Sequence, residues 1–96
     1  MTRLRGKASP ADAEILAVAA LSFLAEEPER LGAFLAETGL EPENMRAAAA
    51  TPGFLPAVLD YLIGHEPLLL DFAADRGIDP AGIPAARAAL PGGRRD

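Results

Sequence analysis

A chain of 96 residues is long enough for one domain with its own core and too short for two. Half of the residues are apolar and only 5% are aromatic, and alanine and leucine dominate, so helices are favoured over strands. The absence of cysteine excludes disulfide bonds, thiolate catalysis and the common structural zinc sites. We therefore expect a single all-α domain.

Charge is divided unevenly along the chain. The whole chain carries a net charge of −5, but the part between Ala8 and Gly93 contains four basic and 13 acidic residues, a net charge of −9. The basic excess lies in two tails, residues 1–8 and 93–96, which we expect to be flexible ends. A protein that binds nucleic acid through its folded surface shows the opposite distribution, so the domain is not expected to bind nucleic acid.

The N-terminus is basic, as in a signal peptide, but Pro10, Asp12 and Glu14 interrupt the segment that follows, so the basic residues are not followed by the continuous apolar region of a signal peptide. The longest uncharged run, residues 15–25, is too short to span a bilayer. We therefore expect a cytoplasmic protein without a membrane span.

At six places a serine, threonine, aspartate or glutamate is followed by proline, and each of these pairs predicts the start of a helix. Proline suits the first turn of a helix, where its missing N–H needs no partner, and serine, threonine and aspartate before it are good N-caps. The pairs are Ser9-Pro10, Glu27-Pro28, Glu41-Pro42, Thr51-Pro52, Glu66-Pro67 and Asp79-Pro80. In chain order they predict a compact bundle of six short helices over residues 10–26, 28–38, 42–50, 52–63, 67–76 and 80–90.

Two further prolines, Pro56 and Pro84, each follow an expected start by four residues. A proline inside a helix removes a backbone donor and crowds the carbonyl four residues earlier. Either the first turn of these two helices is 3₁₀, or the helices begin one turn later.

The fourth and fifth helices are the most apolar. Leu55, Val58, Leu59 and Leu62 follow the i, i+3, i+4, i+7 spacing of one helix face. The fifth helix is apolar around much of its circumference, which is typical of a helix that packs on several sides; its apolar residues are Leu68, Leu69, Leu70 and Phe72. We expect these two helices in the middle of the fold.

Residues repeat at a separation of 38 positions. The pattern predicts two copies of a three-helix unit, about residues 9–50 and 51–92, within a single domain of residues 9–92. The matching pairs are Leu21 with Leu59, Phe23 with Tyr61, Leu24 with Leu62, Leu31 with Leu69, and Phe34 with Phe72. A unit of three short helices is too small to close a core alone, so we expect the two copies to pack together.

The segment that repeats best predicts a sharp corner between helices. Gly39 stands where a helix ends in the left-handed conformation that glycine permits, and Leu40 is placed to pack both on the finished helix and on Met45 of the next one. The corner residues of the two copies are Gly39, Leu40, Pro42, Met45, Gly77, Ile78, Pro80 and Ile83. A glycine-led motif can also bind phosphate, but no GxGxxG or GxxxxGK context accompanies this one, so the corner is favoured.

With these helix starts and corners, the chain resembles a family of short bacterial proteins known as domain of unknown function 3572. The resemblance covers roughly residues 12–92. It is carried by residues 23–25, 28–31, 34–35, 39–42, 54–55, 58–59, Leu62 and the ending 88–92. It implies a compact helical protein and supplies no catalytic residues.

His65, the only histidine, lies in the turn between the fourth and fifth helices. Asp60 or Glu66 would be the carboxylate that orients it as a base, but a structural place at the negative end of the fourth helix explains it better. Carboxylates gather in residues 26–29 and 37–43 without an EF-hand pattern or a Glu-x-x-His pair. We expect no catalytic residue, no metal site and no cofactor, and hence no enzyme.

Two functions are favoured over an enzyme, which stays open only as the weakest hypothesis because carboxylate chemistry needs few residue types. The apolar content of so short a chain predicts a protein-interaction module or a homo-oligomer, with an acidic body that favours a basic partner surface. Its predicted interaction surface consists of Phe54, Leu55, Tyr61, His65 and Leu68. The alternative is a binder of small apolar ligands or acyl chains, with a pocket between the two helical units.

Overall fold

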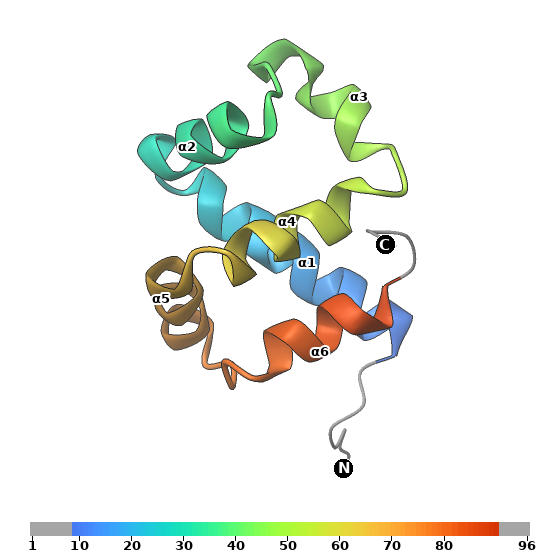
Figure 1. The fold of residues 1–96 in the computed structure, drawn as a ribbon, viewed down its shortest axis with the longest axis vertical. Helices are drawn as coiled ribbons and strands as arrows, with labels where there is room; N and C mark the ends of the chain where they lie inside the picture. Colours follow the sequence, from blue (N-terminus) through green and yellow to red (C-terminus); the bar gives the residue numbers. More distant parts are fainter. Residues whose placement is uncertain (1–8, 91–96) are drawn as a thin grey trace.

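The computed structural model describes residues 9–90, and over this range the chain forms helices and no strand. The helices are α1 (Pro10–Ala25), α2 (Pro28–Thr38), α3 (Met45–Ala49), α4 (Phe54–Ile63), α5 (Glu66–Arg76) and α6 (Gly82–Ala89), and a 3₁₀ turn, η1 (Pro42–Asn44), leads directly into α3. Figure 1 shows how they are arranged. The predicted all-α fold of six short helices is confirmed; the predicted tails, residues 1–8 and 93–96, lie outside the described range.

The helix starts follow the prolines closely. Ser9 caps α1, because the amide of Asp12 donates a hydrogen bond of 3.1 Å to the Ser9 hydroxyl oxygen. Helix α2 and the turn η1 begin at Pro28 and Pro42, as predicted, and α5 begins one residue early, at Glu66. Proline in the first turn therefore located the helices along most of the chain.

Helices α4 and α6 begin two residues later than predicted. Thr51 is not a cap, since its hydroxyl donates at 2.7 Å to the carbonyl oxygen of Ala48. Asp79 accepts a hydrogen bond of 3.0 Å from the amide of Ala81, within the turn that precedes α6. The later starts place Pro56 and Pro84 at the third helical residue, where a missing N–H costs no helical hydrogen bond.

The two predicted corners are present. Gly39 has φ +78° and Gly77 has φ +66°, and they are the only residues between 9 and 90 with positive φ. After each glycine the next amide reaches back into the finished helix, from Leu40 to the Leu35 carbonyl at 3.0 Å and from Ile78 to the Ala73 carbonyl at 2.8 Å. This is the hydrogen bond of a Schellman helix end.

Helix α1 is the central helix, because it packs against α2, α4 and α6 (Figure 1). Its inner face carries Ala13, Ala17 and Ala20, all fully buried, at the spacing of one helical face. The distance between packed helices depends on the side chains at the contact, so an alanine face lets the neighbouring helices approach α1 closely.

Of the two helices expected in the middle, α4 lies there and α5 does not. Helix α5 packs chiefly on α4, burying Leu69, Phe72 and Ala73, while Leu70 remains 46% exposed. The apolar residues of α5 do surround the helix, but their outer members face away from the core. The predicted central position of α5 is therefore wrong.

Aromatic side chains join the two halves of the chain. The ring of Phe23 lies 5.3 Å from that of Phe72, and the ring of Phe34 lies 5.1 Å from that of Tyr61, centre to centre. Phe54 makes an edge contact with Phe34 at 6.2 Å. All five are buried, so the two halves share one core, as their small size required.

Candidate functional site

His65, the histidine that the sequence singled out, lies where α2, α4 and α5 come together. Nδ1 of His65 lies 2.8 Å from the Tyr61 carbonyl oxygen, one helical turn earlier. Because a carbonyl only accepts, Nδ1 carries a proton and donates it. Nε2 lies 3.1 Å from a carboxylate oxygen of Glu37 at the end of α2. The imidazole thus links the end of α4 to the end of α2.

The carboxylate beside His65 is therefore neither of the two that the sequence suggested. Asp60 instead accepts a hydrogen bond of 2.7 Å from Arg87 of α6, and Glu66 opens α5 with an exposed side chain. Within residues 9–90, Glu37 is the only acidic side chain in contact with His65. Glu37 could not be predicted from sequence spacing, because it is 28 positions away from His65 along the chain.

The Tyr61 ring stacks on this histidine, with ring centres 4.4 Å apart and planes inclined by 35°. Burial raises the pKa of the Tyr61 phenol above its ordinary value of 10.0, and the negative charge of Glu37 raises it further. The phenol therefore stays protonated at neutral pH and does not serve as a base there.

The predicted interaction surface is not a continuous exposed patch. Phe54 and Tyr61 are buried in the core, Leu55 and Leu68 are half-buried, and only His65 presents a substantial part of its side chain, 37%, to solvent. The helical pattern identified these residues as apolar, but it did not distinguish the face that packs inward from the face that remains outside.

The most exposed large apolar side chains lie instead on α1, outside the predicted interaction surface. Ile15 is 68% exposed and Val18 is 50% exposed. Together with exposed Ala11 and Ser22 they follow the i, i+4, i+7, i+11 spacing of one helix face. We call these four residues the α1 stripe. The only signal of it in the sequence is the spacing of the alanines on the opposite face, and alanine is too frequent in this chain for that spacing to stand out.

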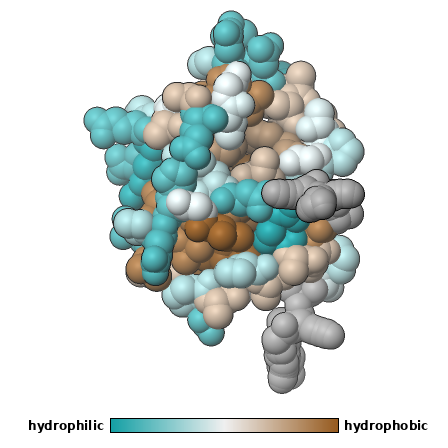
Figure 2. All heavy atoms as spheres, in the orientation of Figure 1, coloured by the Kyte–Doolittle hydropathy of each residue, from teal (hydrophilic) through white to brown (hydrophobic). Residues whose placement is uncertain are grey.

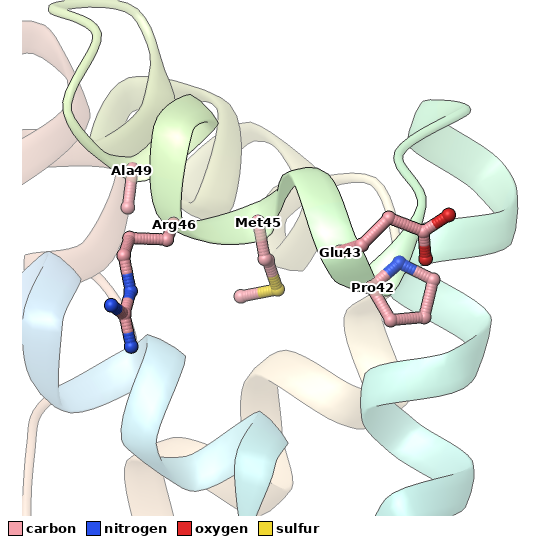
Figure 3. A pocket seen from close by; sticks show the side chains of 5 residues that line it. All are labelled: Pro42, Glu43, Met45, Arg46 and Ala49. Atoms are coloured by element: carbon pink, nitrogen blue, oxygen red, sulfur yellow. The ribbon is translucent and has the colours of Figure 1, made fainter.

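A groove of about 610 Å³ runs along η1 and α3. Its lining residues are Pro42, Glu43, Met45, Arg46 and Ala49. Figure 3 shows the side chains of Met45 and Arg46 pointing from this segment into the space beside α1 and α2. All five lining residues belong to the first half of the chain, so the groove does not correspond to the predicted pocket between the two halves.

Apolar atoms also gather on the face shown in Figure 2, in the area that Figure 1 shows between α5 and α6. Polar atoms surround this area on the same face.

Within residues 9–90, no three acidic or histidine side chains are grouped so as to hold a metal ion. None of the helices described is long and apolar enough to cross a bilayer.

The fold and its surface define a small all-α protein with one shared core, two glycine corners and an apolar stripe on its central helix. The chain belongs to the family described as protein of unknown function (DUF3572), whose sequence model matches residues 10–93. The resemblance noted from the sequence is thereby confirmed. No curated protein and no solved structure matches the chain.

Proposed function

We propose that this protein is a non-catalytic interaction module that binds a partner protein through the α1 stripe. The observation that carries the proposal is the exposure of Ile15 and Val18, side by side on the longest helix, while the opposite face of that helix is completely buried. Exposed apolar side chains that form a contiguous face are typical of binding surfaces, whereas single ones are ordinary.

The charges around the stripe favour a basic partner. Asp12 and Glu14 are exposed on the same helix, and α1 carries no basic residue. Carboxylates at the edge of an apolar surface steer a partner with lysine or arginine beside its own apolar residues. The expected partner therefore presents an apolar strip flanked by basic side chains.

Within residues 9–90 the domain itself offers few basic side chains to a second copy. Three of its four arginines are already engaged, because Arg30 lies 4.0 Å above the Phe23 ring, Arg76 pairs with Glu26, and Arg87 pairs with Asp60, which leaves Arg46. Self-association through the stripe is thus less favoured than binding to another protein. A stable dimer in light scattering would reverse this preference.

The absence of catalysis belongs to the same proposal. The only histidine is engaged by the Tyr61 carbonyl and by Glu37, and a reaction needs a nucleophile or base with a second group to orient it. The alternative, a binder of small apolar ligands, remains a prediction from the sequence.

Affinity capture with matched variants tests the proposal. The tagged protein is used to capture its partner from the lysate of its own host, and it is compared with an Ile15→Glu, Val18→Glu double variant and with Leu70→Glu. Leu70 is a suitable control because it is similarly exposed but lies on α5. All three proteins should melt at similar temperatures, since the changes are on the surface.

We expect the captured protein to be lost with the double variant and retained with Leu70→Glu. Equal capture by all three proteins would place the binding surface elsewhere. Recovery of a monomer without any partner would remove the support for the interaction module altogether.

A further inference from the structure

The α1 stripe continues for one more residue and has the spacing of a seam between two helices. Ala25 is exposed and follows Ser22 by three positions, so the intervals along this face alternate between four residues and three. Apolar residues at this alternation, with a mean of 3.5, are the pattern by which one helix packs along another. After Glu14, every exposed residue of α1 belongs to this face. We call its five residues the α1 seam: Ala11, Ile15, Val18, Ser22 and Ala25.

Acidic residues lie on both edges of the seam near the start of α1. Asp12 follows the seam residue Ala11 and Glu14 precedes the seam residue Ile15, so the two carboxylates lie on opposite sides of it. Both residues are exposed, and within residues 9–90 neither forms an ion pair. Charges at these flanking positions determine which helix pairs with which. Lysine or arginine beside a partner's own apolar residues complements them.

A second copy of the chain does not supply this positive charge. Helix α1 contains no basic residue, so a second α1 placed along the seam brings no cation to Asp12 and Glu14 in either orientation. Arg76, beside the end of α1, already pairs with Glu26 at 2.7 Å. Unpaired or like charges at flanking positions oppose pairing. The seam therefore favours a helix of a different protein.

The dimensions of the seam match a helix better than a strand. From Ala11 to Ala25 it extends about 21 Å, at a rise of 1.5 Å per residue. Its residues recur about every 4.5–6 Å, which is also the interval between residues on one face of another helix. Residues on one face of a strand recur about every 6.6–6.8 Å and lose register with the seam. The small side chains at both ends of the seam let another helix approach closely.

We propose that the α1 seam pairs with a single helix of the partner protein. The partner helix is about four turns long, has apolar residues at alternating intervals of three and four, and carries lysine or arginine on both edges near one end. The rest of the domain holds α1 in place by burying Ala13, Ala17 and Ala20, so α1 itself needs no ordering on binding. This inference rests on the proposed function, because it specifies the kind of partner that the α1 stripe binds.

A synthetic peptide of about 18 residues, held helical by a lactam bridge on its outer face, serves as the probe. This lysine peptide has leucine opposite the small residues of the seam, alanine opposite Ile15 and Val18, and lysine on both edges at one end. Two control peptides accompany it. In the shifted peptide the same apolar residues are moved off the seam, and in the acidic peptide glutamate replaces each lysine.

NMR of ¹³C-labelled isoleucine and valine methyl groups locates the binding. Ile15 and Val18 report on the seam, and Ile63, which is 39% exposed on α4, is the matched control. We expect saturable shifts of the Ile15 and Val18 signals with the lysine peptide, while the Ile63 signal stays in place. The shifted peptide should move none of them. The acidic peptide should bind about fivefold to tenfold more weakly than the lysine peptide.

A variant of the protein tests the charges on the seam edges. Asp12→Asn with Glu14→Gln removes both carboxylates and keeps the side-chain sizes, and it should raise the Kd of the lysine peptide about threefold to fivefold. The control is Glu66→Gln with Asp71→Asn, which makes the same change of net charge on exposed positions of α5. It should leave the Kd nearly unchanged. Circular dichroism establishes that both variants are folded.

Three results would overturn the inference: no saturable shift of the Ile15 signal at millimolar lysine peptide, equal binding of the shifted peptide, or equal effects of the two charge variants. Failure of the proposed function is a separate result, because it appears as unchanged capture of the natural partner by the Ile15→Glu, Val18→Glu variant. Capture that is lost with that variant, together with a lysine peptide that does not bind, would mean that the α1 stripe binds a partner that presents no such helix.

Discussion

Replacing Gly39 by alanine isolates the conformational cost of a helix corner. Gly39 has φ +78°, and no atom lies within 4 Å of the position that a Cβ would take. The added methyl group therefore meets no neighbour, and the whole effect comes from holding a residue with a side chain in the left-handed region. That costs about 1–2 kcal/mol. Gly77, with φ +66° and equally open surroundings, should give the same loss.

The same substitution at Gly32 should have the opposite sign. Gly32 lies inside α2, seven positions before the corner, and an added Cβ there also meets nothing within 4 Å. In the interior of a helix alanine is preferred to glycine by roughly 0.5–1 kcal/mol. Gly32→Ala is therefore a matched control, with identical chemistry, similar exposure and the same helix.

Thermal unfolding followed by circular dichroism measures both effects. For a domain of this size each kcal/mol shifts the Tm by about 4–8 °C. Gly39→Ala and Gly77→Ala should therefore melt lower than the parent protein and Gly32→Ala slightly higher. Gly39→Asn should lose less than Gly39→Ala, because asparagine tolerates positive φ. Equal shifts in Gly39→Ala and Gly32→Ala would refute the assignment of the corner.

Three further predictions concern the core and the ionisable groups. Tyr61 is the only tyrosine and there is no tryptophan, so a pH titration followed by absorbance near 295 nm reports this phenol alone. The midpoint of the titration should lie above 10.0, and it should be lower in Glu37→Gln, which removes the negative charge. Because folding raises this pKa, ionisation of the phenol does not affect stability below pH ~10, where it is protonated in both states. As pH rises further, the unfolded state ionises first and the folded state becomes less stable. A phenol midpoint at or below the ordinary value would contradict the burial of Tyr61. Atoms of Asp60 and Arg87 lie 2.7 Å apart, and the carboxylate is 51% exposed. A double-mutant cycle on this pair, measured by urea unfolding, should give a coupling free energy of about 0.2–1 kcal/mol. Zero coupling would show that the pair does not stabilise the fold. Phe72→Ala should lose about 3–5 kcal/mol since Phe72 is fully buried, and a loss below 1 kcal/mol would be incompatible with the core described.

Local chemistry made most of the fold predictable. Proline and a capping residue act within one helical turn, so Ser9 and Pro28 located their helices from sequence alone. The left-handed glycines are similarly local, and both corners were found. The prediction failed by two residues at α4 and α6 because Thr51 and Asp79 make turn hydrogen bonds in place of caps.

What depends on distant contacts was not predictable. The central position of α1 rests on the buried alanines at 13, 17 and 20, but alanine is frequent throughout this chain and carries little signal. The pairs Glu26–Arg76 and Glu37–His65 join residues 50 and 28 positions apart, and no spacing rule connects them. The exposed α1 stripe could be identified only after the structure had shown which face of α1 points inward.

The packing of α6 against α1 joins the two ends of the described chain (Figure 1). During synthesis α1 emerges first, and its alanine face has no C-terminal cover until α6 has left the ribosome. Most of the remaining core is made by then, so the core of the domain closes only when α6 has emerged. A nascent chain that stalls before Gly82 exposes the apolar side chains that α6 would cover, which makes it a substrate for chaperones and proteases.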